Sequence, residues 1–137
     1  MKIPDEGKAS AFTKLPWHDA KLLELRIARD SVLDQDNLAC VVEFMAAHNS
    51  WHRAIVTLRD CTIAKIDLDL DGKRVCADSI FSATCEREST LKRSLEAGQL
   101  RGERHPLTDY YHFHILLVSP GGELNAFAKD FQIAWSD

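Results

Sequence analysis

The sequence predicts an α+β domain, a curved antiparallel β-sheet of about six strands with one main helix packed on it, in the order ββββ-α-ββ. Apolar and polar residues alternate over much of the chain, and short turn sequences separate these stretches. A single later stretch has the spacing of a short helix. Strands that short turns connect are most simply antiparallel neighbours, which gives the sheet its expected topology.

The first half of the chain is expected to hold four strands, at about residues 23–28, 38–44, 54–59 and 64–71. The sequence DQDN at 34–37 is typical of a turn between the first two. Asn49-Ser50 is interpreted as a two-residue hairpin loop, which would pair residue 48 with residue 51. Asp71-Gly72 is the turn that ends the fourth strand.

The second half is expected to hold the helix and the remaining strands. Residues 86–97 have helical spacing, and Gly98 stands where a C-terminal cap belongs. Strands are expected at 110–118 and 124–135. Residues 1–14 are expected to form an N-terminal arm that can move, outside the core of a single domain spanning 1–137.

Charge and composition narrow the range of partners. The 21 acidic and 17 basic residues give a net charge of −4, which argues against nucleic acid or an anionic membrane surface. The N-terminus lacks the apolar segment of a secretion signal, and we expect a cytoplasmic protein. The four cysteines form no CxxC pair and are interpreted as small buried hydrophobic residues.

The triplet Trp17-His18-Asp19 is the first candidate site. Asp19 could orient His18 as a general base, but neighbours on a strand point to opposite faces and do not pair easily. The structural interpretation is favoured. In it Trp17 plugs one end of the core, Asp19 accepts backbone N–H groups at a turn, and His18 bonds a neighbouring strand.

Asp67, Asp69, Asp71 and Gly72 match the opening of a calcium-binding EF-hand loop. Position 12 of that loop would be Asp78, where a longer glutamate is usual. The preceding residues alternate with a period of two, whereas an EF-hand requires a helix there. The aspartates are therefore interpreted as the outward acidic face of a strand.

His112 and His114 are two residues apart on an expected strand, so both imidazoles should lie on one face. Such a pair can hold two positions of a zinc site, but a third ligand is required. His48 and His52 are the best candidates, although the expected hairpin turns them to opposite faces. No metal is therefore expected, and the two histidines are assigned to the less buried face of the sheet or to the lining of a shallow groove.

The segment LPWHDAKLLELRI at 15–27 resembles the opening of small uncharacterised bacterial β-rich proteins that carry an aromatic-His-Asp strand motif. Some immunity proteins of polymorphic-toxin systems are among them. The closing segments LNAFA and FQIAW look similar as well. The resemblance implies a non-enzymatic protein-interaction module that binds and neutralises a cognate toxin, with no cofactor and no catalytic residue.

A basic toxin would suit an acidic face containing Glu43, Asp67, Asp69 and Asp71. Two alternatives stay open: a small metal-binding protein or metal-dependent hydrolase that uses His112 and His114, and a small-ligand-binding domain. The ligand would lie between sheet and helix, against Tyr110, Tyr111, Phe113 and Trp135. A homodimer through an open sheet edge is a further expectation.

Overall fold

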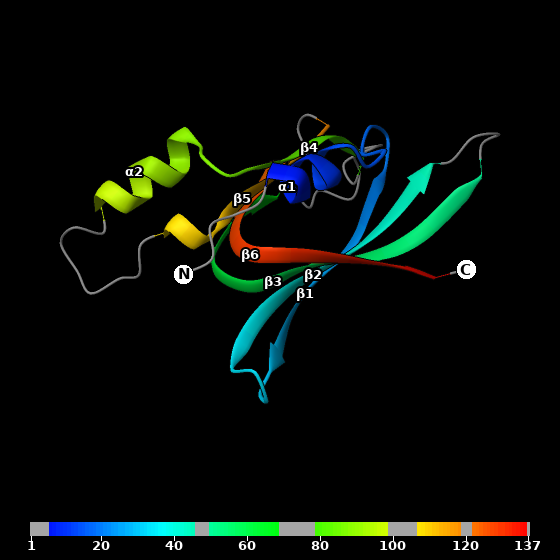
Figure 1. The fold of residues 1–137 in the computed structure, drawn as a ribbon. Helices are drawn as coiled ribbons and strands as arrows, with labels where there is room; N and C mark the ends of the chain where they lie inside the picture. The colour runs from blue at the N-terminus through cyan, green and yellow to red at the C-terminus, as the bar shows by residue number, and fades with distance from the viewer. Residues whose placement is uncertain (1–5, 46–49, 69–78, 99–106, 119–121, 137) are drawn as a thin grey trace.

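The structure is a computed structural model, which describes residues 6–45, 50–68, 79–98, 107–118 and 122–136 (Figure 1). The strands within these residues are β1 (Lys21–Asp30), β2 (Gln35–Met45), β3 (Trp51–Leu68), β4 (Ile80–Glu86), β5 (Tyr111–Leu117) and β6 (Gly122–Ser136). The helices are α1 (Glu6–Thr13), α2 (Thr90–Gly98) and the short 3-10 helix η3 (Leu107–Asp109).

The six strands form one antiparallel sheet in the order β1-β2-β3-β6-β5-β4. The sheet curls until the start of its last strand meets the start of its first. There the N–H of Ile80 donates to the carbonyl of Ala20 at 2.7 Å, and the N–H of Asp19 donates to the carbonyl of Ile80 at 3.0 Å. The Thr13 hydroxyl accepts the N–H of Cys85 at 3.1 Å. The outer edge of β4 is therefore covered by the chain between α1 and β1.

The main core lies on the concave face of this sheet, and α1 packs into it. Phe12 is fully buried, with ring centroids 4.8 Å from Trp17, 4.9 Å from Phe113 and 5.2 Å from Phe131. The alternating apolar residues of β2, β3, β5 and β6 fill the rest of the core. Burial of alternate residues is the expected result of a strand's period of two.

A smaller cluster lies on the convex face under α2. Leu91 and Leu95 of α2 pack against Leu107, Tyr110 and Phe127. Figure 1 shows α2 well separated from α1. The sheet therefore carries a helix on each face.

The prediction of a six-stranded antiparallel sheet is confirmed, whereas the prediction of one main helix in the order ββββ-α-ββ is wrong because α1 precedes the first strand. Residues 6–13, expected to be an arm, form this helix, since burying Phe12 offsets the entropy of ordering a short segment.

Four strands do precede α2, but they are not the four expected. The third and fourth expected strands are one continuous strand, β3, and β4 lies in a stretch for which the sequence pattern predicts no strand. The two-residue hairpin at Asn49-Ser50 is also wrong, because Trp51 pairs with Met45 and the connection is longer. Residue 48 lies outside the described residues.

Candidate functional site

The Trp17-His18-Asp19 triplet lies at the turn that leads into β1. Trp17 fills one end of the core, as the sequence predicts, and its indole Nε1–H donates to the Phe12 carbonyl at 2.7 Å. Asp19 has a left-handed backbone, with φ of 67°, and its N–H bonds Ile80 of β4. The triplet thus fixes the junction between α1, β1 and β4.

His18 and Asp19 contact each other, contrary to the expectation that they point apart. His18 Nδ1 lies 3.1 Å from Asp19 Oδ2, because the residues occupy a turn with positive φ rather than a strand. Their side chains are 73% and 60% exposed. The contact is therefore open to solvent on both side chains.

The residues of the expected acidic face do not come together. Glu43 on β2 lies 3.5 Å from Arg53 near the start of β3. Asp67 is fourteen residues further along β3, about 45 Å of strand at 3.3 Å per residue. Asp69 and Asp71 lie outside the described residues. The segment before Asp67 is a strand, as predicted, which rules out the helix that an EF-hand needs there.

His112 lies in a buried hydrogen-bond network between β5, β6 and the start of α2. Its Nε2 is 2.7 Å from Asn125 Oδ1, which can only accept, so Nε2 carries the proton. Its Nδ1 then accepts the hydroxyl proton of Ser89 at 2.8 Å. The Ser89 oxygen also accepts the N–H of Lys92 at 3.0 Å and so caps α2.

The order Ser89-His112-Asn125 is that of a nucleophile, a base and an orienting group. Both Ser89 and His112 are buried, and the His112 ring stacks on Phe127 at 4.8 Å. Burial lowers the pKa of His112, so the imidazole is neutral. The network therefore holds the first turn of α2 against β5 and β6.

His114 lies on the same face as His112, as predicted, with ring centroids 6.1 Å apart. Its Nε2 bonds Glu123 Oε2 at 2.7 Å. Both nitrogens of His112 are already bonded, so a metal would have to displace Ser89 or Asn125. Across the described residues, no three His, Cys, Asp or Glu side chains gather as the ligands of a metal ion would.

Lys92 is a buried charged residue that the sequence pattern did not reveal. Its Nζ donates to the carbonyl of Arg87 at 2.6 Å and lies 3.5 Å from a Glu88 carboxylate oxygen. The ammonium group therefore links the residues just before α2 to the first turn of that helix. These contacts stabilise the start of the helix.

The β1–β2 hairpin extends away from the rest of the sheet (Figure 1). Most of β1 is exposed, and three large apolar side chains lie near the tip in solvent: Ile27 at 80%, Val32 at 90% and Leu33 at 55% exposure. Single exposed apolar residues are common on protein surfaces, but here several lie together on one projecting element.

The tip of this hairpin is ordered by its own hydrogen bonds. Asp30 Oδ1 accepts the N–H groups of Val32 and Leu33, each at 3.1 Å. Arg29 bonds Asp36 Oδ1 at 2.8 Å and also contacts Asp34. Residues 28–37 carry three carboxylates and one guanidinium, a net charge of −2. The tip of the hairpin is thus acidic and held in place by its own side chains.

The sheet splits where this hairpin leaves β3. Pairing between β2 and β3 ends at Leu38 and Leu58, whereas β3 stays paired with β6 as far as Leu68. At the split Asp60 has a φ of 53°, and its N–H donates to Asn37 Oδ1 at 2.9 Å. The Asn37 side chain thus satisfies a backbone group that β2 no longer pairs.

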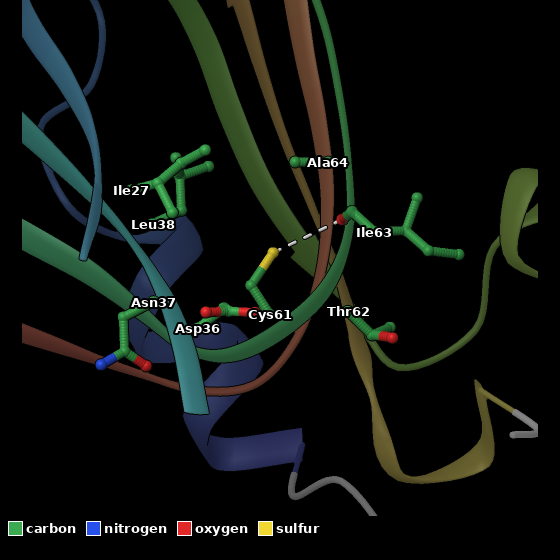
Figure 2. A pocket seen from close by; sticks show the side chains of 8 residues that line it. All are labelled: Ile27, Asp36, Asn37, Leu38, Cys61, Thr62, Ile63 and Ala64. Atoms are coloured by element: carbon green, nitrogen blue, oxygen red, sulfur yellow. Dashed lines mark hydrogen bonds between the residues drawn. The ribbon is translucent and has the colours of Figure 1, made fainter. Parts of the chain in front are cut away.

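A cleft of about 240 Å³ lies in this split, between the hairpin and the second half of β3. Figure 2 shows Ile27 and Leu38 on one side, Cys61 and Ala64 on the other, and the Ile63 side chain turned away. Burial raises the pKa of the Cys61 thiol to about 11, so it is not a ready nucleophile. The cleft is smaller than the roughly 300–1,000 Å³ of ordinary ligand pockets.

The aromatic residues expected to line a ligand pocket do not converge. Tyr111 and Phe113 belong to the concave core, Tyr110 to the cluster under α2, and Trp135 is half exposed. Cys40 and Cys85 are buried, as predicted, whereas Cys61 is half-buried and Cys76 lies outside the described residues. Burial raises the pKa of Cys40 to about 12.

Comparison of the chain with protein-family models, with curated proteins and with solved structures found no match. None of the helices that the structure describes has the length and apolar character needed to cross a membrane. The candidate site is therefore identified from the geometry of this chain alone, and its main element is the β1–β2 hairpin.

Proposed function

We propose that the protein is a non-enzymatic protein-interaction module that docks on a protein partner through its β1–β2 hairpin. The observation that carries this proposal is the exposure of Ile27, Val32 and Leu33 on one projecting element. Burying apolar surface contributes about 25 cal/mol per Å². Because the tip is already ordered by Asp30 and Arg29, less conformational entropy is lost on binding.

The charge of the hairpin favours a basic partner. Its tip carries three carboxylates and one arginine, so its net charge is negative. A negative surface is complementary to a cationic one and increases the rate at which the two proteins associate. The resemblance of residues 15–27 to immunity proteins favours a cognate toxin as that partner. The acidic surface of this proposal is Asp30, Asp34 and Asp36 rather than the scattered Glu43 and Asp67.

The buried network around His112 supports a non-enzymatic role. Both imidazole nitrogens are bonded within the protein, and the Ser89 hydroxyl caps α2. The exposed His18–Asp19 pair has no enclosing walls. These groups explain local folding without a substrate.

The test is capture of a partner from a lysate of the organism that encodes the protein, with the wild-type protein and two variants as bait. Val32→Asp places a charge at the apolar tip. Phe81→Asp is the matched control, because Phe81 is also an exposed apolar residue, 54% exposed, but lies on β4. Circular dichroism verifies that both variants are folded.

We expect a basic protein that the wild type and Phe81→Asp both retain and that Val32→Asp loses. Equal capture by all three baits would overturn the hairpin as the docking element. Failure of the wild type to enrich any protein over empty resin would overturn the proposed function.

A further inference from the structure

The second half of β3 presents an open sheet edge. From Cys61 to Leu68 the strand pairs with β6 on one side, and no described strand pairs with its other side. In an antiparallel sheet, alternate residues of such an edge direct N–H and C=O groups outward. Ile66 on this edge is 45% exposed. The edge is therefore a template for one more strand.

We propose that the strand is β3 of a second copy of this chain, paired antiparallel about a two-fold axis at Ile66. The sequence Lys65-Ile66-Asp67 is self-complementary in this register. Lys65 of each copy lies opposite Asp67 of the other, and the two Ile66 residues face each other. Opposite charges directly across an antiparallel pair stabilise it, and like charges destabilise it.

Charge selects this register over the adjacent one on the same strand. A two-fold axis at Lys65 would place the two Lys65 side chains opposite each other. The axis at Ile66 instead forms two ion pairs. Within one copy, Asp67 lies across from Glu123 of β6, a like-charged neighbour, and Lys65 lies across from Asn125. Lys65 of the second copy supplies the cation that Asp67 lacks among the described residues.

The cleft in the split sheet extends the contact. In this register Leu68 of the second copy lies opposite Ala64, which lines the cleft together with Ile27 and Leu38. Ala64 and Leu68 share the face of β3 that pairs with Ala126 and Gly122. The added strand thus ends at the cleft that β2 leaves when it diverges from β3.

The other open edge is a weaker template. Glu24-Leu25-Arg26 on β1 is also self-complementary, but Arg26 Nε already lies 3.3 Å from Glu24 Oε1 in the same strand. The ladder of β1 is interrupted between Leu22 and Glu24, close to where that two-fold axis would lie. A bulge of this kind opposes edge-to-edge pairing.

The test is sedimentation velocity of the wild type and of the charge variants Lys65→Asp and Asp67→Lys over a wide range of concentration. Each single variant places two like-charged pairs across the axis, and we expect the dimer to weaken by about tenfold to a hundredfold. An equimolar mixture of the two variants restores both ion pairs and should restore the dimer. Glu24→Lys on β1 is the control and should dimerise like the wild type.

Both substituted side chains are exposed, and circular dichroism verifies the fold of each variant before mixing. A wild type that is monomeric throughout would overturn the proposal. So would a dimer indifferent to both substitutions, or a mixture that stays monomeric. None of these outcomes bears on the hairpin, whose test uses Val32→Asp.

Discussion

Replacing Phe12 with alanine tests whether α1 is part of the core. Phe12 has no exposed surface and contacts three aromatic rings at 4.8–5.2 Å. Deleting a buried phenylalanine costs about 3–5 kcal/mol through lost transfer free energy and the cavity left behind. A domain is typically stable by about 5–15 kcal/mol, so the loss is a large share of the total.

The assay is urea unfolding followed by circular dichroism, with Phe81→Ala as the control. Phe81 is 54% exposed, and we expect its truncation to cost no more than about 1 kcal/mol. The Phe12→Ala variant should also melt roughly 10–20 °C lower, at about 3–4 °C per kcal/mol for a chain of this size. A loss below about 1 kcal/mol for Phe12→Ala would show that residues 6–13 are an arm outside the core.

Two further predictions concern His112 and Gly122. Burial lowers the pKa of His112 in the folded protein, so the unfolded chain takes up a proton on this histidine at a higher pH than the folded protein does. The stability that the neutral imidazole contributes is therefore complete above the unfolded pKa of about 6.5 and is lost as the pH falls below it. Urea unfolding at several pH values should therefore show a wild-type advantage over His112→Asn that shrinks in acid, and an advantage independent of pH would contradict the assignment. Gly122 has a φ of 103°, and a Cβ there would lie 2.0 Å from the Asp67 carbonyl oxygen. Gly122→Ala should therefore lower the free energy of unfolding by about 1–3 kcal/mol, measured by thermal unfolding. An unchanged melting temperature would mean that this end of the β3–β6 pair is loosely paired.

Local patterns were sufficient for the strands in which every second residue on the core-facing side is apolar. Leu38, Cys40, Val42 and Phe44 of β2 are all buried on one face, as their spacing predicts. The alternation in β5 likewise predicted that His112 and His114 share a face. The sequence also favoured a structural role for Trp17, which the core contains.

The same patterns failed where the backbone departs from regular geometry. The ladder of β4 is irregular between Ile80 and Ser82, which disturbs its alternation and hid the strand. The positive φ at Asp60 and the irregularity after Cys61 made one long strand look like two. Helix α1 is short and depends on Phe12, so it carries almost no periodic signal.

The sequence by itself determined the antiparallel β-rich class, the apolar faces of its regular strands and the Lys65-Ile66-Asp67 charge pattern. These are local properties, because the side-chain period of a strand is read from neighbouring residues. Only the tertiary structure decided that β3 pairs with β6, that β2 leaves β3 at Asp60, and that the β1–β2 hairpin projects into solvent. Those features depend on which distant segments pair, and pairing is selected by the burial of the whole core.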